Sequence, residues 1–244
     1  MTEADFLNSY EPAAYERPSV TVDLVLTSII DGQLSALLQR RGEEPQKDCW
    51  ALPGGFVGID EGLDEAARRV LAQKAHMSDA YLEQLYTFGT PNRDPRMRVI
   101  TISYFALLSA DQFSEALKSG TDLTLAKLII PWAGETGGTV AACNEDDQEL
   151  PLAFDHAKIL GHAVKRLRGK LDYSRIGFAL LPELFTLRQL QDVREAILGT
   201  RFNKPAFRRR LLDKGWIEGT GVRETGASFR PAELYRLKQK RGEG

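Results

Sequence analysis

Cysteine and long apolar segments are scarce in this chain of 244 residues. Its two cysteines, Cys49 and Cys143, are too few for a disulfide framework and indicate reduced thiols in a cytoplasm. No apolar run approaches the ~18 residues that a membrane span needs. The acidic, polar segment 1–12 also lacks the basic and apolar regions of a signal peptide. We therefore expect a cytoplasmic globular protein with no membrane partner.

The net charge of −2 conceals a strong asymmetry between the two parts of the chain. Residues 1–152 carry 12 Lys and Arg against 24 Asp and Glu, whereas residues 153–244 carry 20 against 10. A basic terminal third next to an acidic domain is typical of nucleic-acid binding. Chance clustering of solvated charge is the alternative, and composition alone does not decide between them.

The pattern of the first 152 residues predicts a mixed α/β domain behind an N-terminal arm without strong periodicity. An apolar, β-branched strand over 20–30 is followed by the turn pair Asp31-Gly32 and a hairpin partner over 33–41. Further strands are expected over 49–57, 81–90 and 98–108, with helices over 62–75 and 110–118 and loops over 91–97 and 130–150. The helix over 62–75 has one apolar face, which we expect to pack on the strands.

From residue 153 the apolar period becomes helical. An amphipathic helix over 153–171 is interpreted as a linker, and two further helices follow over 181–200 and 203–215. Thr186 and Asn203 are suitable N-caps, and Gly199 and Gly215 are suitable C-terminal stops. Two strand-like runs around a Gly/Thr-rich turn complete the order of a winged helix-turn-helix domain. We place the domain boundary between residues 152 and 153.

Residues 54–77 have the frame of the Nudix hydrolase box, which is Gly, five residues, Glu, seven residues, and then Arg-Glu-apolar-x-Glu-Glu-x-Gly-apolar. The chain matches this pattern at Gly55, Glu61, Arg69, Leu71 and Met77. The preceding WALPGGFV run makes a coincidental match improbable. The segment therefore resembles a Nudix domain.

The box lacks the three helix glutamates, because Val70, Gln73 and Lys74 stand in their places. In a working box such glutamates hold divalent cations that polarise a diphosphate for attack by water. Glu61 and Glu65 remain, but two acids without the central cluster make a weak metal site. We therefore expect no metal, no catalytic residue and no cofactor. Lys74 is expected either to pair with a ligand diphosphate in place of the metal or to be a solvated surface charge.

The residues expected to hold a phosphate-bearing ligand combine the box loop with nearby arginines, because guanidinium groups suit phosphate bidentately. They are Arg40, Arg41, Gly54, Gly55, Phe56, Glu61, Arg69, Lys74, Arg93 and Arg96. Phe56, Tyr86 and Phe88 could stack on a base, although strand aromatics usually belong to the core. His156 and His162 are far in sequence from any cysteine or acidic cluster and are taken as structural.

The helix over 203–214 divides into an apolar side and a basic side. Phe207 and Leu211 should face the core, flanked by Leu212, while Lys204 and Arg208 share another face. A helix that enters the DNA major groove requires this division, although a basic face can also serve solubility alone. The residues expected to contact DNA are Thr186, Lys204, Arg208, Arg209, Arg223 and Arg230.

Together, WALPGGFV, LAFDH and FRRRLLDKGW resemble the NrtR family of Nudix-related transcriptional regulators of NAD metabolism. The resemblance covers nearly the whole chain. It implies an α+β protein: a Nudix-like α/β/α sandwich with a mixed sheet, followed by a winged helix-turn-helix domain. It also implies ADP-ribose as the effector, repression of NAD-biosynthesis or salvage genes, and a homodimer on a palindromic double-stranded operator.

Three other functions stay open. They are a Nudix-type regulator of sugar metabolism, a Nudix pyrophosphatase with unusual metal ligation, and a nucleic-acid-binding module that ignores nucleotides. For the regulator we expect the effector to move the winged helices through the helix over 153–170, because a ligand shifts an equilibrium only by binding one arrangement better.

Overall fold

The computed structural model describes residues 1–244 except 79, 226–230 and 239–244. An eight-stranded sheet forms its larger part, with the order β5-β6-β1-β2-β7-β8, β3 beside β2 and β4 beside β1. The strands are β1 (Ser19–Ile30), β2 (Gln33–Arg40), β3 (Trp50–Ala51), β4 (Gly54–Phe56), β5 (Glu83–Phe88), β6 (Val99–Leu107), β7 (Leu123–Ile129) and β8 (Ala141–Cys143). None of the described helices is long and apolar enough to cross a membrane.

The central strand β1 makes the sheet mixed, because it pairs parallel with β6 and antiparallel with β2 and β4. The antiparallel partner follows at once through the predicted turn, where Asp31 and Gly32 have φ values of 49° and 74°. Positive φ at both central positions gives a hairpin whose twist matches that of the strands. The predicted hairpin of 20–30 and 33–41 is therefore confirmed.

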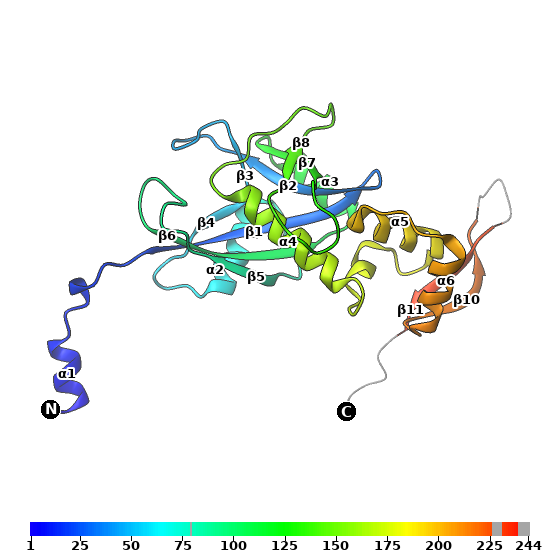
Figure 1. The fold of residues 1–244 in the computed structure, drawn as a ribbon. Coiled ribbons are helices and arrows are strands. Elements are labelled where there is room, and N and C mark those ends of the chain that lie inside the picture. Colours follow the sequence, from blue (N-terminus) through cyan, green and yellow to red (C-terminus); the bar gives the residue numbers. More distant parts are fainter. Residues whose placement is uncertain (79, 226–230, 239–244) are drawn as a thin grey trace.

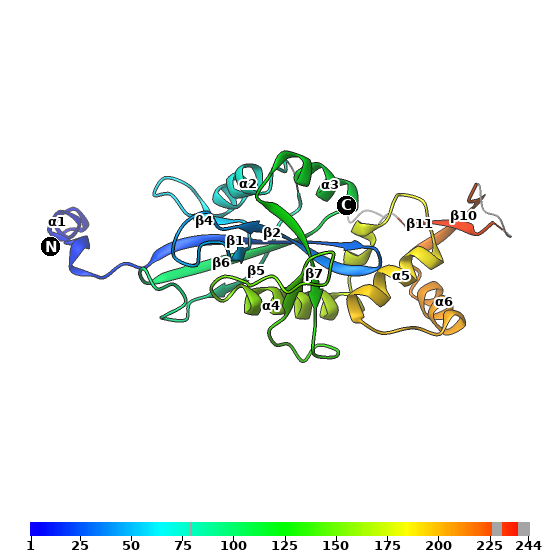
Figure 2. The ribbon, with the colours of Figure 1, turned by 90° about the horizontal axis from the view of Figure 1, so that it is seen from above.

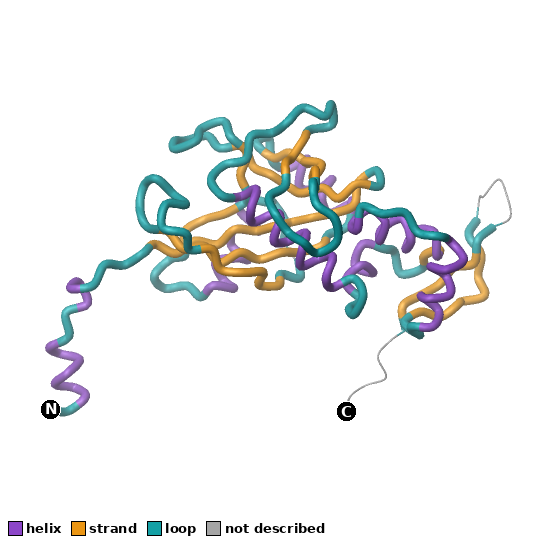
Figure 3. Tube along the Cα trace, in the orientation of Figure 1, coloured by secondary structure: helices purple, strands orange, loops and turns teal. Residues whose placement is uncertain are grey.

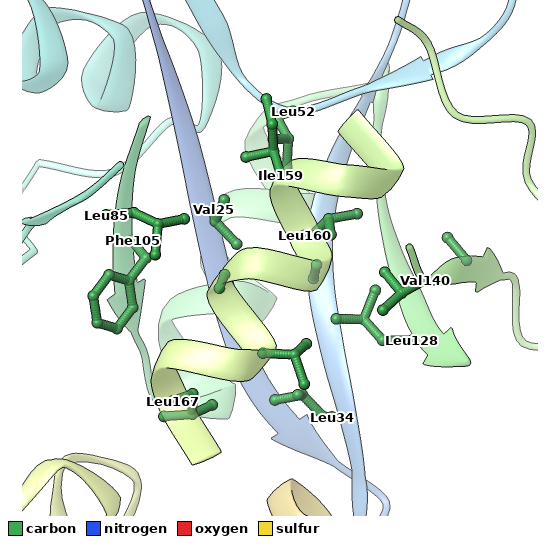
Figure 4. Close-up of a cluster of buried hydrophobic side chains, with 14 of the residues drawn as sticks. Val25, Leu34, Leu52, Leu85, Phe105, Leu128, Val140, Ile159, Leu160 and Leu167 are labelled. Atoms are coloured by element: carbon green, nitrogen blue, oxygen red, sulfur yellow. The ribbon is translucent and has the colours of Figure 1, made fainter. Parts of the chain in front are cut away.

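Alternate residues of β1 supply two separate cores. Val22, Leu24 and Leu26 pack under α2 (Leu63–Lys74) and α3 (Ala110–Ser119), whereas Val25 faces α4 (His156–Lys170) on the other side. Figure 2 shows α2 and α3 above the sheet and α4 below it. Figure 4 shows apolar side chains of α4 meeting those of the strands. This is the expected α/β/α sandwich.

Helix α4 is one layer of that sandwich. Its side chains Ile159, Leu160, Val164 and Leu167 are buried against the sheet. The predicted division into 1–152 and 153–244 cuts between the sheet and the helix that covers it. The core that α4 shares with the sheet continues to Val193 and Ile197.

The C-terminal unit is a winged helix at one end of the sheet, while the N-terminal arm leaves from the other end (Figures 1 and 3). Its elements are η2 (Ile176–Leu180), β9 (Phe185–Thr186), α5 (Leu187–Leu198), α6 (Lys204–Asp213), β10 (Ile217–Arg223) and β11 (Glu233–Leu237). The three strands form a small sheet, and a core that includes Phe185, Leu190, Phe207 and Tyr235 lies beneath them.

Helix α5 joins the two units because it contributes to both cores. Val193 and Ile197 pack with α4 and the main sheet, and Leu190 packs in the winged-helix core. Two buried arginines cross the α4–α5 contact. Arg168 donates from Nε to the Ile197 carbonyl at 2.9 Å, and Arg194 donates from Nη1 to the Leu171 carbonyl at 2.6 Å.

Several elements differ from the expectation. Residues Glu3–Ser9 of the arm form helix α1, which buries no side chain, and strands β7 and β8 were not predicted. In the segment 181–200 the helix begins at Leu187 with Thr186 as its N-cap, as predicted. Leu212, expected beside the core, is 42% exposed, because only Phe207 and Leu211 of α6 point inward.

Replacing Arg168 with Met should lower the free energy of unfolding by roughly 1.5–3 kcal/mol, because hydrogen bonds from a charged donor are lost and buried carbonyls remain unsatisfied. Urea denaturation followed by tryptophan fluorescence measures this change. Arg236→Met is the control: Arg236 is 58% exposed in a surface ion pair with Glu218, and its loss should change stability by about 0.5 kcal/mol or less. Equal stability of Arg168→Met and the parent protein would contradict the role of Arg168.

Candidate functional site

An open pocket of about 570 Å³ lies beside the first residues of β1. This volume is in the range of small-molecule sites, roughly 300–1,000 Å³. Eight of the ten predicted ligand residues line it together: Arg40, Arg41, Gly54, Gly55, Phe56, Lys74, Arg93 and Arg96. The chain thus brings the segments 40–44, 51–56 and 93–96, together with Lys74, around one opening.

A buried ion network lies at the wall of the pocket. Arg93 donates from Nε and Nη2 to the two carboxylate oxygens of Asp155, at 3.0 and 2.6 Å. The same Nη2 lies 3.6 Å from Oδ2 of Asp23, which also accepts a hydrogen bond of 2.7 Å from the Thr101 hydroxyl. The side chain of Arg93 is only 5% exposed, so its guanidinium is already occupied by carboxylates.

Gly54 is required beside this network. It lies opposite Asp23 in the β1–β4 pair, and a Cβ at residue 54 would lie 2.3 Å from Oδ1 of Asp23. Any larger residue would displace the buried carboxylate. The glycine of the box loop therefore serves close packing against an acid.

His156 is a neutral part of the same wall. Its Nδ1 accepts the Leu52 N–H at 2.9 Å, so the proton of the neutral ring is on Nε2, which lies 3.9 Å from Oδ1 of Asp23. Burial lowers the pKa of His156 and outweighs the opposite effect of the Asp23 and Asp155 carboxylates. The expectation that His156 is structural agrees with its buried hydrogen bond, although the residue also lines the pocket.

Two arginine–aromatic pairs form part of the pocket lining. The Arg41 guanidinium lies 4.7 Å from the centre of the Phe154 ring, and that of Arg96 lies 5.7 Å from Phe56. Asp94 accepts hydrogen bonds of 2.8 and 3.0 Å from Arg96, which hold the pKa of Asp94 below its ordinary value. Such pairs offer a planar cation and an aromatic face to a ligand.

Phe154 has an unusual backbone conformation, with φ of 52°. For a bulky residue the left-handed region costs roughly 1–2 kcal/mol. The Phe154 N–H donates to Gln46 Oε1 at 2.7 Å, and the ring lies under Arg41, so contacts with segment 41–46 hold this conformation.

Glu61 and Arg69 do not line this pocket. Arg69 donates from Nε to Glu61 Oε2 at 3.0 Å and from Nη2 to the Phe56 carbonyl at 2.8 Å. Hydrogen bonds from Arg69, and next from the Gly58 N–H, lower the pKa of Glu61 to about 2. The two residues brace the loop that follows Phe56 against α2 and border a neighbouring hollow.

The three substituted box positions differ in their surroundings. Val70 is buried in the core under α2, whereas Gln73 and Lys74 are exposed and Lys74 reaches the pocket. Among the described residues, no group of three or more His, Cys, Asp or Glu side chains could hold a metal ion. Lys74 makes no hydrogen bond or ion pair within the part of the chain that the structure describes, so its ammonium group is available.

The pocket is also lined by four residues that were not among the predicted ligand residues, Asp23, Asp94, Phe154 and His156. Asp23 had a signal, since it is a charged residue inside the apolar run VTVDLVL. A buried charge needs a partner, and that partner, Arg93, is 70 positions away. Only the fold reveals the pairing. Tyr86 and Phe88, weighed as stacking residues, pack against His162 instead.

Helix α6 presents the expected basic surface. Lys204, Arg208 and Arg209 are exposed, while Phe207 and Leu211 are buried. Asn203 caps the helix by accepting the Ala206 N–H at 3.1 Å, as expected. The turn between α5 and α6 is held by buried Glu195. The Gln191 amide, and next the Phe202 N–H, lower the pKa of this carboxyl to about 2.

The other three residues predicted to contact DNA differ in their exposure. Arg223 is exposed on the β10–β11 hairpin, and Arg230 lies outside the described residues. Thr186 is only 6% exposed, and its hydroxyl accepts the Gln189 N–H at 3.1 Å as the cap of α5. The predicted DNA contact of this side chain would therefore have to compete with its cap.

Stability should decrease as the pH falls below 6.5, because His156 is neutral in the folded protein and takes up a proton on unfolding. The folded pKa is lowered, so this contribution is complete above 6.5 and is lost toward the folded pKa. The expected slope approaches about 1.4 kcal/mol per pH unit. Urea unfolding between pH 7.5 and 5.5 should show that His156→Asn, which keeps an acceptor for Leu52, reduces this slope. His76→Asn, at an exposed position, should leave it unchanged; equal slopes in both variants would refute the assignment.

Comparison with known proteins assigns both units to families. Residues 20–124 match the NUDIX domain, and residues 177–237 match the NrtR DNA-binding winged helix domain. The two matches lie on the main sheet and on the C-terminal unit.

Three relatives are similar over large parts of the chain. The ADPR responsive transcriptional repressor NtrR of Acinetobacter baylyi is 38% identical, covering 97% of this chain and 88% of the relative. An ADP-ribose pyrophosphatase of Methanocaldococcus jannaschii is 33% identical over 60% of this chain and 73% of its own length.

The third relative is Shewanella oneidensis NrtR, known in two relevant structures at 36% identity. Its complex with a 27mer DNA covers 90% of this chain and 93% of that chain, with a TM-score of 0.70. Its NUDIX domain in complex with ADP ribose covers 68% of this chain and 99% of that chain, with a TM-score of 0.51. With its Nudix domain, its winged helix and a full-length repressor relative, the chain belongs to the NrtR family of Nudix-related transcriptional regulators.

Proposed function

We propose that this protein is a transcriptional repressor of NAD-biosynthesis or salvage genes that binds ADP-ribose in the Nudix domain and operator DNA with the winged helix. This proposal rests on one observation: the same chain has a pocket whose lining suits phosphate and a winged helix with a basic helix, α6. The repressor relative of A. baylyi and the DNA and ADP-ribose complexes of S. oneidensis NrtR support it. Operator binding would place the protein in the cytoplasm.

The pocket offers suitable chemistry for a nucleoside diphosphate sugar. Arg41, Arg96 and Lys74 provide cations for a diphosphate, and the exposed face of Phe56 suits stacking on a base. Glu61 and Arg69 would act indirectly, by bracing the loop that carries Phe56. Arg93 would reach a ligand only by exchanging one of its carboxylate partners.

Helix α6 would enter the major groove with Lys204, Arg208 and Arg209, and Arg223 would contact the phosphate backbone from the wing. One recognition helix per chain fits a homodimer on a palindromic operator, in which two half-sites are read at a set spacing. The effector would then release DNA by changing that spacing.

We infer that the Nudix domain does not hydrolyse its ligand. Val70 and Lys74 replace two carboxylates of the box, and a buried valine with an exposed lysine cannot hold Mg²⁺. The alternative is an ADP-ribose pyrophosphatase, which the M. jannaschii relative favours. Turnover of ADP-ribose that depends on Mg²⁺ or Mn²⁺ would establish that alternative.

The deciding experiment is fluorescence anisotropy with a palindromic operator from an NAD-biosynthesis promoter, titrated with ADP-ribose at fixed salt. Sequence-dependent binding that ADP-ribose releases is the expected result. DNA binding that ADP-ribose does not change would still support a regulator, and would point to another effector, such as a sugar.

In the same assay the double variant Lys204→Ala/Arg208→Ala should weaken DNA binding sharply. The salt dependence should also become shallower, by about 0.9 in the slope of log affinity against log salt concentration for each lost phosphate contact. Unchanged binding would refute the recognition helix.

Lys74→Ala should weaken ADP-ribose binding by about tenfold if the ammonium group pairs with the diphosphate, since a charge-assisted hydrogen bond contributes about 1.5 kcal/mol. Isothermal titration calorimetry measures the affinity. Lys118→Ala is the matched control, because Lys118 is exposed on α3 and pairs with Glu115 outside the pocket. Equal affinities of the Lys74 variant and the parent protein would show that Lys74 is a solvated surface charge.

A further inference from the structure

Residues 154–156 connect the pocket to the beginning of helix α4. Phe154 and His156 line the pocket, and Asp155 between them holds Arg93 from behind the wall. Asp155 is also the N-cap residue of α4, but its side chain makes no capping hydrogen bond. Its carboxylate serves the pocket wall and not the helix.

The strained backbone at Phe154 is held by contacts that a ligand can change. Phe154 keeps its φ of 52° while Arg41 lies over its ring and Gln46 accepts its N–H. Arg41 lines the pocket, so a ligand phosphate would compete with the Phe154 ring for the same guanidinium. Strained residues at ligand sites persist only where their surroundings hold them.

Arg93 is the second contact that a ligand would disturb. It lines the pocket, and its Nε and Nη2 are bound to Asp155. A guanidinium has five N–H donors in a planar fork that suits phosphate as well as carboxylate. A bound diphosphate would therefore draw Arg93 away from Asp155 and leave the Leu52–His156 hydrogen bond as the remaining side-chain contact of the first turn of α4 with the wall.

The other end of α4 is attached to the DNA-binding unit. Arg168 donates to the Ile197 carbonyl at the end of α5, and the Leu171 carbonyl after α4 accepts from Arg194 of α5. The 15 residues of α4 span about 22 Å at 1.5 Å per residue. Figure 1 shows the helix running from the end of the sheet that carries β3 and β4 toward α5.

We propose that residues 154–156 form the element that transmits occupancy of the pocket to the winged helix, and that Asp155 is its positioning residue. This inference rests on the proposed function, because it needs a ligand in the pocket and DNA on α6. When the ligand binds, Arg93 leaves Asp155 and Arg41 leaves the Phe154 ring, and both pair with the ligand phosphates. The first turn of α4 then shifts, and α4 moves α5 with it.

A movement of the pocket could also reach α5 through the main sheet, and this second route makes the inference testable. The main sheet also reaches α5, because Leu34 of β2 shares a core with Val193 and Ile197. Movement transmitted through β1 and β2 would bypass Asp155 completely. The two routes differ in their response to Asp155→Asn, which keeps the shape of the side chain and one acceptor oxygen but removes the charge that holds Arg93.

The experiment measures a coupling ratio, defined as the Kd for operator DNA with saturating ADP-ribose divided by the Kd without it. Anisotropy supplies both values at one salt concentration, and saturation removes the effect of any change in ligand affinity. The full-length protein should give a ratio within the roughly 5- to 150-fold range typical of allosteric coupling. Asp155→Asn should reduce the ratio to less than twofold while the ligand still binds in calorimetry.

Asp146→Asn is the matched control, because it removes the same charge from an exposed residue of the loop after β8 and should keep the parent ratio. Phe154→Gly is a second variant, because glycine accepts a positive φ without strain and removes the ring beneath Arg41. It should also reduce the ratio, and it decides the question if Asp155→Asn does not fold.

A parent-like ratio in a folded Asp155→Asn or Phe154→Gly protein would overturn the inference and leave the proposed function intact. A coupling ratio of one in the parent protein, with DNA and ADP-ribose both bound, would contradict the proposed ligand-responsive repression and therefore also this inference. Failure of the parent protein to bind ADP-ribose would do the same.

Discussion

The packing of α5 in two cores is the constraint on which the arrangement of the molecule depends. Val193 and Ile197 face the main sheet and α4, while Leu190 faces the winged helix. Arg168 and Arg194 add hydrogen bonds in both directions across the α4–α5 contact. A winged helix attached by a flexible linker could turn independently of the Nudix domain. Here a turn relative to the Nudix domain would have to repack the core that α5 shares with α4 and the main sheet.

A second constraint acts at the pocket, where the fold buries several charges together. Asp23 and Asp155 would be costly to bury alone, and Arg93 between them makes the wall stable. Gly54 leaves room for Asp23, and the Leu52 N–H selects the neutral form of His156. The interior of the pocket is therefore held by ion pairs and hydrogen bonds, while two cations at its lining, Arg41 and Arg96, lie against the rings of Phe154 and Phe56.

Much of the fold could be predicted from local patterns, and most of the predicted ligand residues do line one pocket. The hairpin at Asp31-Gly32, the cap at Thr186 and the stop at Gly199 are local and were predicted. Strand β8 has three residues and helix α1 has seven, which is too short for a periodic pattern. Asp23 and Asp155 could not be found because their shared partner, Arg93, is far away in sequence. Leu212 was misjudged because helical spacing alone does not define how wide the buried face of α6 is.

The hydrogen-bond partners of Arg168 determine how its contacts at the joint between the two units respond to salt. Its guanidinium binds the carbonyls of Ile197, Trp132 and Gly134 and lies over the Trp132 ring, with no carboxylate among these partners. Carbonyls and indole rings do not titrate, and a buried contact is weakly screened by salt. The attraction of a basic protein surface for DNA phosphates, in contrast, depends steeply on ionic strength. Changes in salt concentration would therefore alter the affinity for DNA more than the buried contacts that Arg168 makes at the joint between the two units.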